Sequence, residues 1–370
     1  MPPIPPAPIK LAILDDYQCI GAQHFEPLKP AFEITVFRDT LLPYNHPSTP
    51  DDVKRQLVER LKPFKVLAIM RERTPLPAEL MKQLPNLKLI LSNGHRNNSL
   101  DLPAAKALGI VITATTGEGR TDKPSPKQRK RKGPDSTTQH AVALILGIAR
   151  CLAADDKNVK SGLWQTDLTT GLSGKTYATM GLGRLGGSVA KIMYQSFGMR
   201  IIAWSNSLTQ EAADQKAQDL GLPTEDEGGK IFEVVGKEEL FEQADVLSVH
   251  YVLSPRSVGI VGAADLALLK PSALFINTSR GPLVTESALL ECLEQGRIRG
   301  AAIDVYDVEP LPLDSKWRTV KWGEDGRSNV LLSPHMGYVE EETMGNWYEE
   351  QVEIAQRWYE GKDLIKVLNP

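Results

Sequence analysis

The chain has 370 residues, of which 41% are hydrophobic and 24% are charged. This composition excludes a wholly disordered chain and a small disulfide-stabilised module, and at roughly 150 residues per domain the length indicates two domains. The formal net charge of −3 gives no overall field that would favour nucleic acid or an anionic membrane as a partner.

Neither a membrane span nor a secretory signal is expected. The longest apolar run, residues 141–149, is too short to cross a bilayer, and the proline-rich residues 1–8, expected to form a loose tail, lack an apolar signal core. Three widely spaced cysteines, without any CxxC, favour a reducing compartment over a disulfide framework or a zinc site. We therefore expect a cytoplasmic protein without a resident metal.

Short apolar runs alternate with amphipathic segments in the first third of the chain. Strands are predicted at 11–15, 34–37, 66–70, 87–91 and 110–113, and helices at 51–61, 77–84 and 102–108. This alternation is typical of an α/β domain with a parallel sheet. The segment 339–360 is predicted to be one helix, long enough to return to this domain.

The alternation stops at a basic segment, residues 117–135. Seven basic residues stand against one acid over 120–132. Such a run indicates either a solvated inserted loop or a nuclear-targeting or nucleic-acid-binding patch. We favour the inserted loop, without a nucleic-acid partner, because prolines and charges bury no apolar surface. A long helix is predicted to follow over 136–154, with Ser136 or Thr137 as its N-cap.

A second α/β alternation follows the basic segment. Strands are predicted at 176–180, 200–204, 244–250, 273–277, 300–304 and 329–333, with helices at 184–197 and 286–295 among them. The fold class predicted is therefore α/β, with two Rossmann-like parallel-sheet domains.

A GxGxxG motif joins a predicted strand to a predicted helix in this second domain. In that context glycines let the backbone approach a pyrophosphate, and the helix N-terminus supplies N–H donors. The alternative is a glycine-rich turn without a ligand. We favour the dinucleotide site, with five contact residues: Gly181, Gly183, Arg184, Leu185 and Gly186.

The end of the following strand bears on which dinucleotide binds. An NAD site normally has a carboxylate there, which binds the ribose 2′-hydroxyl, but the sequence has Ser205 and Asn206. Small neutral side chains admit a 2′-phosphate, although the next basic residue is Lys216. On charge grounds NADP is slightly favoured over NAD, and both stay open.

Three predicted strands are each followed by a residue suited to catalysis. Arg280, Glu309 and His335 should lie at the carboxyl edge of the sheet, where ligands bind in open α/β sheets. Arg280 can bind a carboxylate or polarise a ketone, His335 can transfer a proton, and Glu309 can raise the histidine pKa. Taken one at a time, each of these residues could have a purely structural role. Taken together, and with the glycine loop, they favour a catalytic site.

Four motifs, taken together, make the chain resemble a known family. GLGRLG, NTSRGPLV, GAAIDVYDVEP and SPHMGY, in this order, resemble the D-isomer-specific 2-hydroxyacid dehydrogenases. The resemblance implies a homodimer with a discontinuous, flavodoxin-like substrate domain and an NAD(P)-binding Rossmann domain. We accordingly expect residues 1–135 and 336–370 to form the substrate domain, and residues 136–335 to form the dinucleotide-binding domain.

The resemblance also implies roles for single residues. Arg280, Glu309 and His335 match the catalytic positions, and Asp304 matches the residue that binds the nicotinamide carboxamide. The remaining matches are positions lining the nicotinamide side (His250, Thr278, Gly337) and the loop whose N–H groups hold the substrate carboxylate (His95, Arg96).

The chain departs from the family pattern at four places, the largest of which is the basic stretch around residues 123–132. Residues 94–98 read GHRNN where most members have GxGxDN, so Arg96 replaces a glycine and points either to the substrate or to solvent. Ser205 replaces the usual aspartate. Residues 313–326 lengthen the link between Glu309 and His335, and we expect them to form a surface excursion.

The function predicted is the reduction of a small 2-keto acid, such as glyoxylate or hydroxypyruvate, to a D-2-hydroxy acid with NAD(P)H. A dinucleotide-sensing protein like the family's transcriptional corepressors is the alternative, slightly favoured by the KQRKRK run. A third possibility is an enzyme impaired by the insertion.

Overall fold

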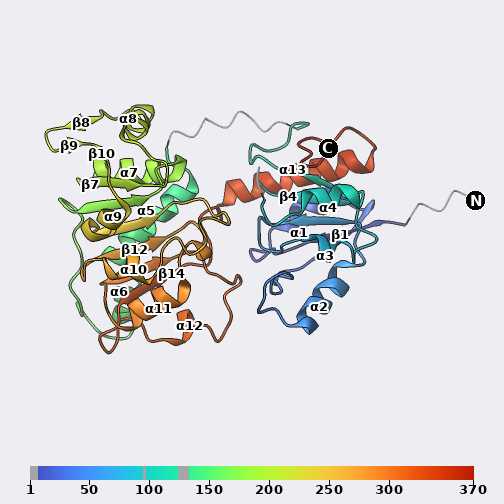
Figure 1. Cartoon of the computed structure of the whole chain (residues 1–370). Coiled ribbons are helices and arrows are strands. Elements are labelled where there is room, and N and C mark those ends of the chain that lie inside the picture. The colour runs from blue at the N-terminus through green and yellow to red at the C-terminus, as the bar shows by residue number, and fades with distance from the viewer. Residues whose placement is uncertain (1–6, 95–96, 124–132) are drawn as a thin grey trace, which may run out of the picture. The chain divides into compact units, whose positions relative to one another are not determined.

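The computed structural model describes residues 7–94, 97–123 and 133–370, and the chain divides into two compact units (Figure 1). Unit 1 comprises Met1–Arg131, Val308–Pro310 and Val339–Pro370; unit 2 comprises Lys132–Asp307 and Leu311–Tyr338. We expected the divisions at 135/136 and 335/336, and these stay a prediction for the domains. The difference is 308–310, which we expected in the dinucleotide-binding domain and which the structure groups with unit 1.

Unit 1 is built on a five-stranded parallel sheet with the order β2-β1-β3-β4-β5, the flavodoxin-like order. Its strands are β1 (Ile9–Ile13), β2 (Phe32–Val36), β3 (Val66–Ile69), β4 (Leu89–Ser92) and β5 (Val111–Thr113). Its helices are α1 (Gly21–Phe25), η1 (Glu26–Leu28), α2 (Asp51–Leu61), α3 (Ala78–Met81), α4 (Leu102–Ala107) and α13 (Glu341–Tyr359).

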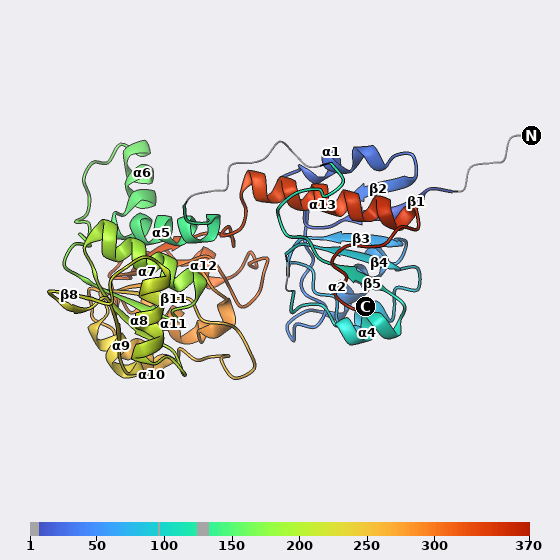
Figure 2. The same cartoon turned by 90° about the horizontal axis from the view of Figure 1, so that it is seen from above.

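Helix α13 completes unit 1 from the far end of the sequence. It runs beside α1 and over the sheet (Figure 2). The fully buried Gln351 side chain donates hydrogen bonds to the carbonyl oxygens of Ile69 (3.3 Å) and Leu91 (2.8 Å). Because these carbonyls belong to β3 and β4, the last helix is joined to the middle of the sheet by polar as well as apolar contacts.

The described start of the basic segment is fixed to α13 by two buried carboxylates. Glu350 accepts hydrogen bonds from the backbone N–H groups of Thr116 (2.5 Å), Gly117 (2.7 Å) and Gly119 (3.0 Å). Glu353 accepts one from the N–H of Thr121 at 2.6 Å. The inserted loop therefore leaves unit 1 from a hydrogen-bonded stem; residues 124–132 lie outside the described residues.

Unit 2 is built on a seven-stranded parallel sheet with the order β10-β7-β6-β11-β12-β13-β14, the doubly wound Rossmann order. Its strands are β6 (Thr176–Met180), β7 (Arg200–Trp204), β10 (Phe232–Val234), β11 (Val246–Val249), β12 (Leu274–Asn277), β13 (Gly300–Ile303) and β14 (Asn329–Leu332), with a separate hairpin of β8 (Glu225–Asp226) and β9 (Gly229–Lys230). The helices are α5 (Ser136–Ala149), α6 (Leu152–Lys160), α7 (Arg184–Phe197), α8 (Gln210–Asp219), α9 (Lys237–Gln243), α10 (Ala263–Ala267), η2 (Gly281–Leu283), α11 (Glu286–Glu294) and α12 (Lys316–Thr319).

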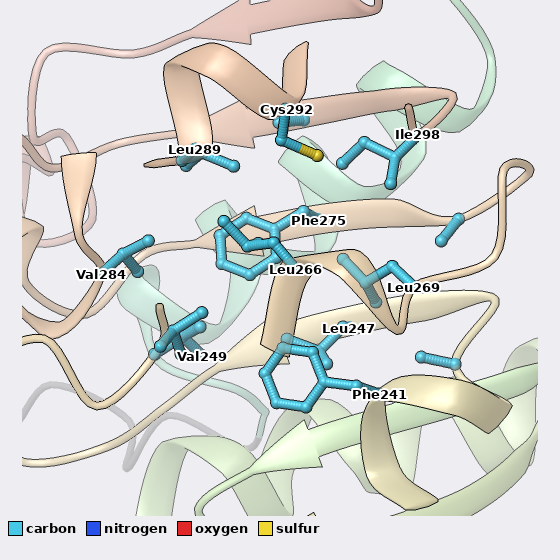
Figure 3. Packing of buried hydrophobic residues seen from close by; sticks show 14 of the residues in the cluster. Phe241, Leu247, Val249, Leu266, Leu269, Phe275, Val284, Leu289, Cys292 and Ile298 are labelled. Carbon is cyan, nitrogen blue, oxygen red and sulfur yellow. The ribbon is translucent and has the colours of Figure 1, made fainter. Parts of the chain in front are cut away.

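Helices cover both faces of this sheet, so its central strands β11, β12 and β13 are buried on both sides. Figure 3 shows one face, where Phe241 of α9, Leu266 of α10 and Cys292 of α11 pack around Phe275 of β12. On the other face α5, α7 and α8 bury a second apolar cluster that includes Tyr177. The predicted α/β class with two parallel sheets is confirmed.

Two local predictions in unit 2 were wrong. The helix expected over 136–154 ends at Ala149: Cys151 adopts a positive φ of 54°, and α6 leaves at 58°. Its N-cap is Asp135, whose carboxylate accepts from the N–H of Thr138 at 2.8 Å, and not Ser136 or Thr137. Residues 313–326 are mostly exposed, as expected for a surface excursion, and the buried Trp317 anchors them by packing edge-on against Tyr306.

No single helix in the described part of the chain is long and apolar enough to cross a membrane, although α5 and α6 pass that test as a bent pair. The described residues contain no group of three His, Cys, Asp or Glu side chains placed to hold a metal ion. Cys19, Cys151 and Cys292 are free thiols.

Candidate active site

The glycine loop follows β6, and two of its glycines have no room for a side chain. A Cβ on Gly181 would lie 2.7 Å from the carbonyl oxygen of His250, and a Cβ on Gly186 would lie 2.0 Å from that of Gly181. Gly183 is exposed, with no neighbouring atom within 4 Å of a Cβ, and no side chain caps α7 behind it. Exposed backbone N–H donors and an open glycine fit the diphosphate of a dinucleotide.

The other predicted loop residues lie at its rim. Leu185 is half-buried, and the exposed Arg184 side chain forms an ion pair with Asp135, the N-cap of α5. That ion pair joins the glycine loop to the residue at which the basic segment ends.

His250 belongs to a row of polar side chains in the sheet beneath this loop. Its Nε2 lies 2.9 Å from Ser248 Oγ and 3.2 Å from Tyr177 Oη. Burial lowers the pKa of His250 to about 4 and raises the pKa of Tyr177. The imidazole is therefore neutral near pH 7; its predicted place beside the nicotinamide stays a prediction.

Ser205 and Asn206 follow β7, as predicted. The backbone N–H of Asn206 donates to Tyr251 Oη at 3.3 Å, and the Tyr251 ring stacks on Trp204. The stretch from Trp204 to Ser207 carries no carboxylate.

The loop that carries Arg280 is shaped by its neighbours in sequence. The Asn277 amide accepts from the N–H of Ser279 and donates to the carbonyl oxygen of Arg280, both at 3.1 Å. A Cβ on Gly281 would lie 2.1 Å from the carbonyl carbon of Tyr306, so the loop packs directly on the backbone after β13. Arg280 Nη1 donates to the carbonyl oxygen of Ser279 at 2.8 Å.

Asp304, at the end of β13, organises the segment that follows β14. Its buried carboxylate accepts from the N–H groups of Met336 (2.8 Å) and Gly337 (3.3 Å). His140 Nε2 lies 3.0 Å from both Asp304 Oδ1 and Ser333 Oγ. The predicted residues Asp304 and Gly337 are thus in contact.

His335 lies between Ser333 and Met336 with a positive φ of 56°, rare for a residue with a side chain. Its ring packs edge-on against Tyr338, with centroids 5.7 Å apart. Such backbone conformations cluster at functional sites. Thr278, after β12, is buried at the same edge of the sheet.

Glu309 lies in unit 1, whereas Arg280 and His335 lie in unit 2. Glu309 Oε2 accepts from Arg73 Nη1 at 2.5 Å, and both side chains are largely buried. Next to Arg73, Thr74 Oγ1 donates to both carboxylate oxygens of Asp15, at 3.0 and 3.1 Å. Burial raises the pKa of Asp15 to about 6, against the opposing hydrogen bonds and the Arg73 charge.

The predicted substrate loop is described only at its ends. Gly94 has a positive φ of 77° and donates its N–H to Thr115 Oγ1 at 3.1 Å. Asn97 Nδ2 donates to the carbonyl oxygen of Arg71 at 2.7 Å, and Arg71 Nη1 donates to that of Asn93 at 3.2 Å. The predicted substrate contacts His95 and Arg96 lie outside the described residues.

Sequence reasoning missed His140 and Tyr251 as neighbours of the site, and it indicated Arg73 only as part of a first-domain loop that shapes the substrate pocket. His140 stands alone on an apolar helix, a pattern also typical of a core residue. Arg73 belongs to the MRERTP segment, but nothing in the sequence links it to Glu309, 236 positions away.

Rossmann topology with a glycine loop that fits a diphosphate places the chain in the class of dinucleotide-dependent oxidoreductases. Family models agree: residues 142–337 match the D-isomer specific 2-hydroxyacid dehydrogenase NAD binding domain, and residues 24–122 match the catalytic domain of that family. The chain belongs to the D-isomer-specific 2-hydroxyacid dehydrogenase family.

The relatives of this chain are named after different substrates. The chain is 32% identical over 268 residues to a glyoxylate reductase of Thermococcus litoralis, covering 70% of each chain. It is 31% identical over 280 residues to a D-3-phosphoglycerate dehydrogenase of Synechocystis sp., covering 75% of this chain but only 44% of that one. A crystal structure of phosphoglycerate oxidoreductase from Vibrio cholerae O395 superposes with a TM-score of 0.76, at 33% identity, over 95% of this chain and 99% of that chain.

Proposed function

We propose that the protein reduces a small 2-keto acid to its D-2-hydroxy acid with NAD(P)H. The observation that supports it most is the carboxyl edge of the seven-stranded sheet, where the glycine loop, Arg280, Asp304 and His335 follow β6, β12, β13 and β14. Ligands bind at this edge in open α/β sheets. Family membership supports the reaction class.

In this proposal the chain's own residues bind the keto acid and move a proton. Arg280 binds the substrate carboxylate and polarises the ketone, because its guanidinium presents several fixed donors. His335 donates a proton to the carbonyl oxygen and takes it back in the oxidising direction. The bound nicotinamide supplies the hydride. Glu309 orients the imidazole and stabilises its charged form.

Further residues position the reactants. The oxygens of Asp304 already accept from backbone N–H groups, and Oδ1 also lies 3.0 Å from His140 Nε2. Oδ2 has a second lone pair to accept from the nicotinamide carboxamide. Thr278, His250 and Gly337 line the nicotinamide side, and the loop with His95 and Arg96 holds the substrate carboxylate.

The dinucleotide that fits best is NADP(H), with NAD(H) admitted. Ser205 and Asn206 place no negative charge where a 2′-phosphate would lie, and a carboxylate at this point would repel it. The preference is expressed as the ratio of kcat/KM values for the two reduced cofactors.

A substrate panel tests the proposal. Glyoxylate, hydroxypyruvate and other 2-keto acids are each mixed with NADH or NADPH, and the loss of nicotinamide absorbance is followed; D-3-phosphoglycerate is tested in the oxidising direction. Turnover of one class of acid supports the proposal and identifies the substrate. Nucleotide binding without turnover of any acid would refute it and favour a dinucleotide-sensing protein.

We also propose a cytoplasmic homodimer, as the family resemblance implies. The segment after α6 supports self-association, since Trp164 and Leu168 are 74% and 83% exposed, and exposed apolar clusters mark interfaces. Light scattering should give twice the chain mass for the wild type and one chain mass for Trp164→Asp. Leu313→Asp, at another exposed leucine, is the control and should stay dimeric.

A further inference from the structure

Tyr251 links the ends of two strands that are not neighbours. It follows β11 by two positions, and its ring stacks on Trp204 at the end of β7, with centroids 5.9 Å apart and planes 17° apart. Its hydroxyl accepts a hydrogen bond from the N–H of Asn206 at 3.3 Å. In the sheet β7 and β11 lie on either side of β6, so this contact crosses the strand that leads into the glycine loop.

The backbone of Tyr251 is held in place from two sides. Ser279 Oγ donates to its carbonyl oxygen at 2.7 Å. A Cβ on Gly181 would lie 3.4 Å from the Tyr251 nitrogen, which puts the glycine loop in close contact with this residue. The position of the Tyr251 ring therefore follows from the same backbone that shapes the diphosphate site.

The Tyr251 hydroxyl stands at the corner where Rossmann proteins bind the adenosine ribose. That position normally carries a carboxylate, which accepts from the 2′-hydroxyl. A tyrosine hydroxyl has one proton to donate besides its acceptor lone pairs. Here an acceptor site is used by the Asn206 N–H, and the proton can be donated to an oxygen of the nucleotide.

The charge around this corner also differs from that of an NAD site. Lys237 Nζ lies 5.9 Å from the centroid of the Trp204 ring, ion-paired with Asp265 at 2.7 Å and donating to the carbonyl oxygen of Ile260 at 2.6 Å. Its charge is compensated by Asp265, so the corner is close to neutral. A neutral donor forms a stronger hydrogen bond with a phosphate than with a hydroxyl group.

We propose that Tyr251 is the specificity-determining residue for the adenosine ribose, its hydroxyl donating a hydrogen bond to a 2′-phosphate and so favouring the 2′-phosphorylated dinucleotide. The ring, stacked on Trp204, keeps that hydroxyl in place. The inference deepens the proposed cofactor use and rests on dinucleotide binding by unit 2, but not on the identity of the keto acid.

Calorimetric titration of the full chain with 2′,5′-ADP and with 5′-AMP tests the inference without turnover. The wild type should bind 2′,5′-ADP more tightly than 5′-AMP. Tyr251→Phe keeps the stacked ring and should lose about tenfold in affinity for 2′,5′-ADP, the usual worth of a hydrogen bond to a charged group, with little change for 5′-AMP. Tyr251→Asp should reverse the preference by repulsion.

Tyr194→Phe is the matched control, because it removes a hydroxyl that contacts Asp226 in the same unit; its affinities should equal those of the wild type. Unchanged 2′,5′-ADP binding by Tyr251→Phe, or no wild-type preference for 2′,5′-ADP, overturns the inference. Keto-acid turnover is measured in parallel. If the wild type turns over a keto acid but does not prefer 2′,5′-ADP to 5′-AMP, only the role of Tyr251 is refuted. If the wild type binds nucleotide but turns over no keto acid, it is the proposed function that fails.

Discussion

Arg73 and Glu309 form a largely buried ion pair, with Nη1 and Oε2 2.5 Å apart. The contact fixes residues 308–310 to unit 1, although the residues on either side of them belong to unit 2. A guanidinium so placed keeps a partly buried carboxylate ionised. Arg73 thereby governs the charge of Glu309, the residue to which we assign a role beside the catalytic histidine under the proposed function.

Removing Arg73 should therefore change the pH dependence of catalysis. In Arg73→Ala the pKa of Glu309 should rise because its cationic partner is lost, so the acid limb of the kcat/KM profile should move to higher pH. A loss of about 10- to 100-fold near neutral pH is expected, partly restored in Arg73→Lys, which keeps the charge but not the planar fork.

The ion pair of Arg60 with the exposed Asp39 provides the control for this experiment. Arg60→Ala should leave the profile unmoved. An Arg73→Ala profile with the wild-type acid limb would show that the ion pair only holds the segment in place.

The two glycines of the nucleotide loop should respond differently to alanine. Gly186→Ala should destabilise unit 2 by about 2–4 kcal/mol, because its Cβ would lie 2.0 Å from a backbone oxygen. Gly183→Ala meets no neighbouring atom and should melt like the wild type, yet bind dinucleotide at least tenfold more weakly. Thermal melts with and without dinucleotide separate the loss of stability from the loss of affinity. Equal melting temperatures for both variants without dinucleotide would contradict the predicted destabilisation by Gly186→Ala.

Asp15 should make unit 1 less stable as the pH rises. Its pKa is raised from 3.8 to about 6, so between these values the folded protein retains a proton that the unfolded chain has released. The unfolding free energy then falls by about 3 kcal/mol as pH rises through this window. The stability that protonated Asp15 contributes is fully present below pH 4 and is lost above pH 6.

Urea denaturation of the wild type and Asp15→Asn on both sides of that window measures this effect. Asparagine cannot ionise, so the variant's stability relative to the wild type should increase with pH. Asp39→Asn, at an exposed carboxylate, should show no such trend. Parallel pH dependences for the wild type and Asp15→Asn would rule out the buried titration.

His335→Ala should abolish turnover while leaving nucleotide binding intact, because the substitution removes the proposed proton donor alone. Loss of at least 10³-fold in kcat is expected, within the range that general acid catalysis supplies. His46→Ala, at a histidine whose ring accepts from the N–H of Ser48, is the control. Near-normal turnover by His335→Ala would disprove the assignment.

The strands could be predicted because parallel strands buried on both faces are continuous apolar runs. Thr176–Met180 and Arg200–Trp204 have the predicted bounds, and so does the glycine-loop helix Arg184–Phe197. The short edge strand β10 was not predicted, since only Phe232 in it is fully buried. The break at Cys151 was missed because the apolar run suggests an unbroken helix, and only the backbone shows the positive φ.

The candidate site could be predicted where motif and strand end coincide, as for Gly181, Arg280 and Asp304. The contacts of His140, Tyr251 and Arg73 depend on partners 45 to 236 positions away along the chain. Side-chain reach across a sheet edge is decided by tertiary packing, which no local pattern encodes.

The placement of α13 has a consequence for protein synthesis. Unit 1 begins at the N-terminus but needs residues 339–368 to cover β3, β4 and β5, where Gln351 binds two strands and Val367 pairs with Thr113. Unit 2 has all its strands once Leu332 has been translated. On the ribosome the second unit can therefore close first, while the apolar face of the first sheet stays uncovered until the last helix emerges, the period in which this chain is most exposed to aggregation and to chaperones.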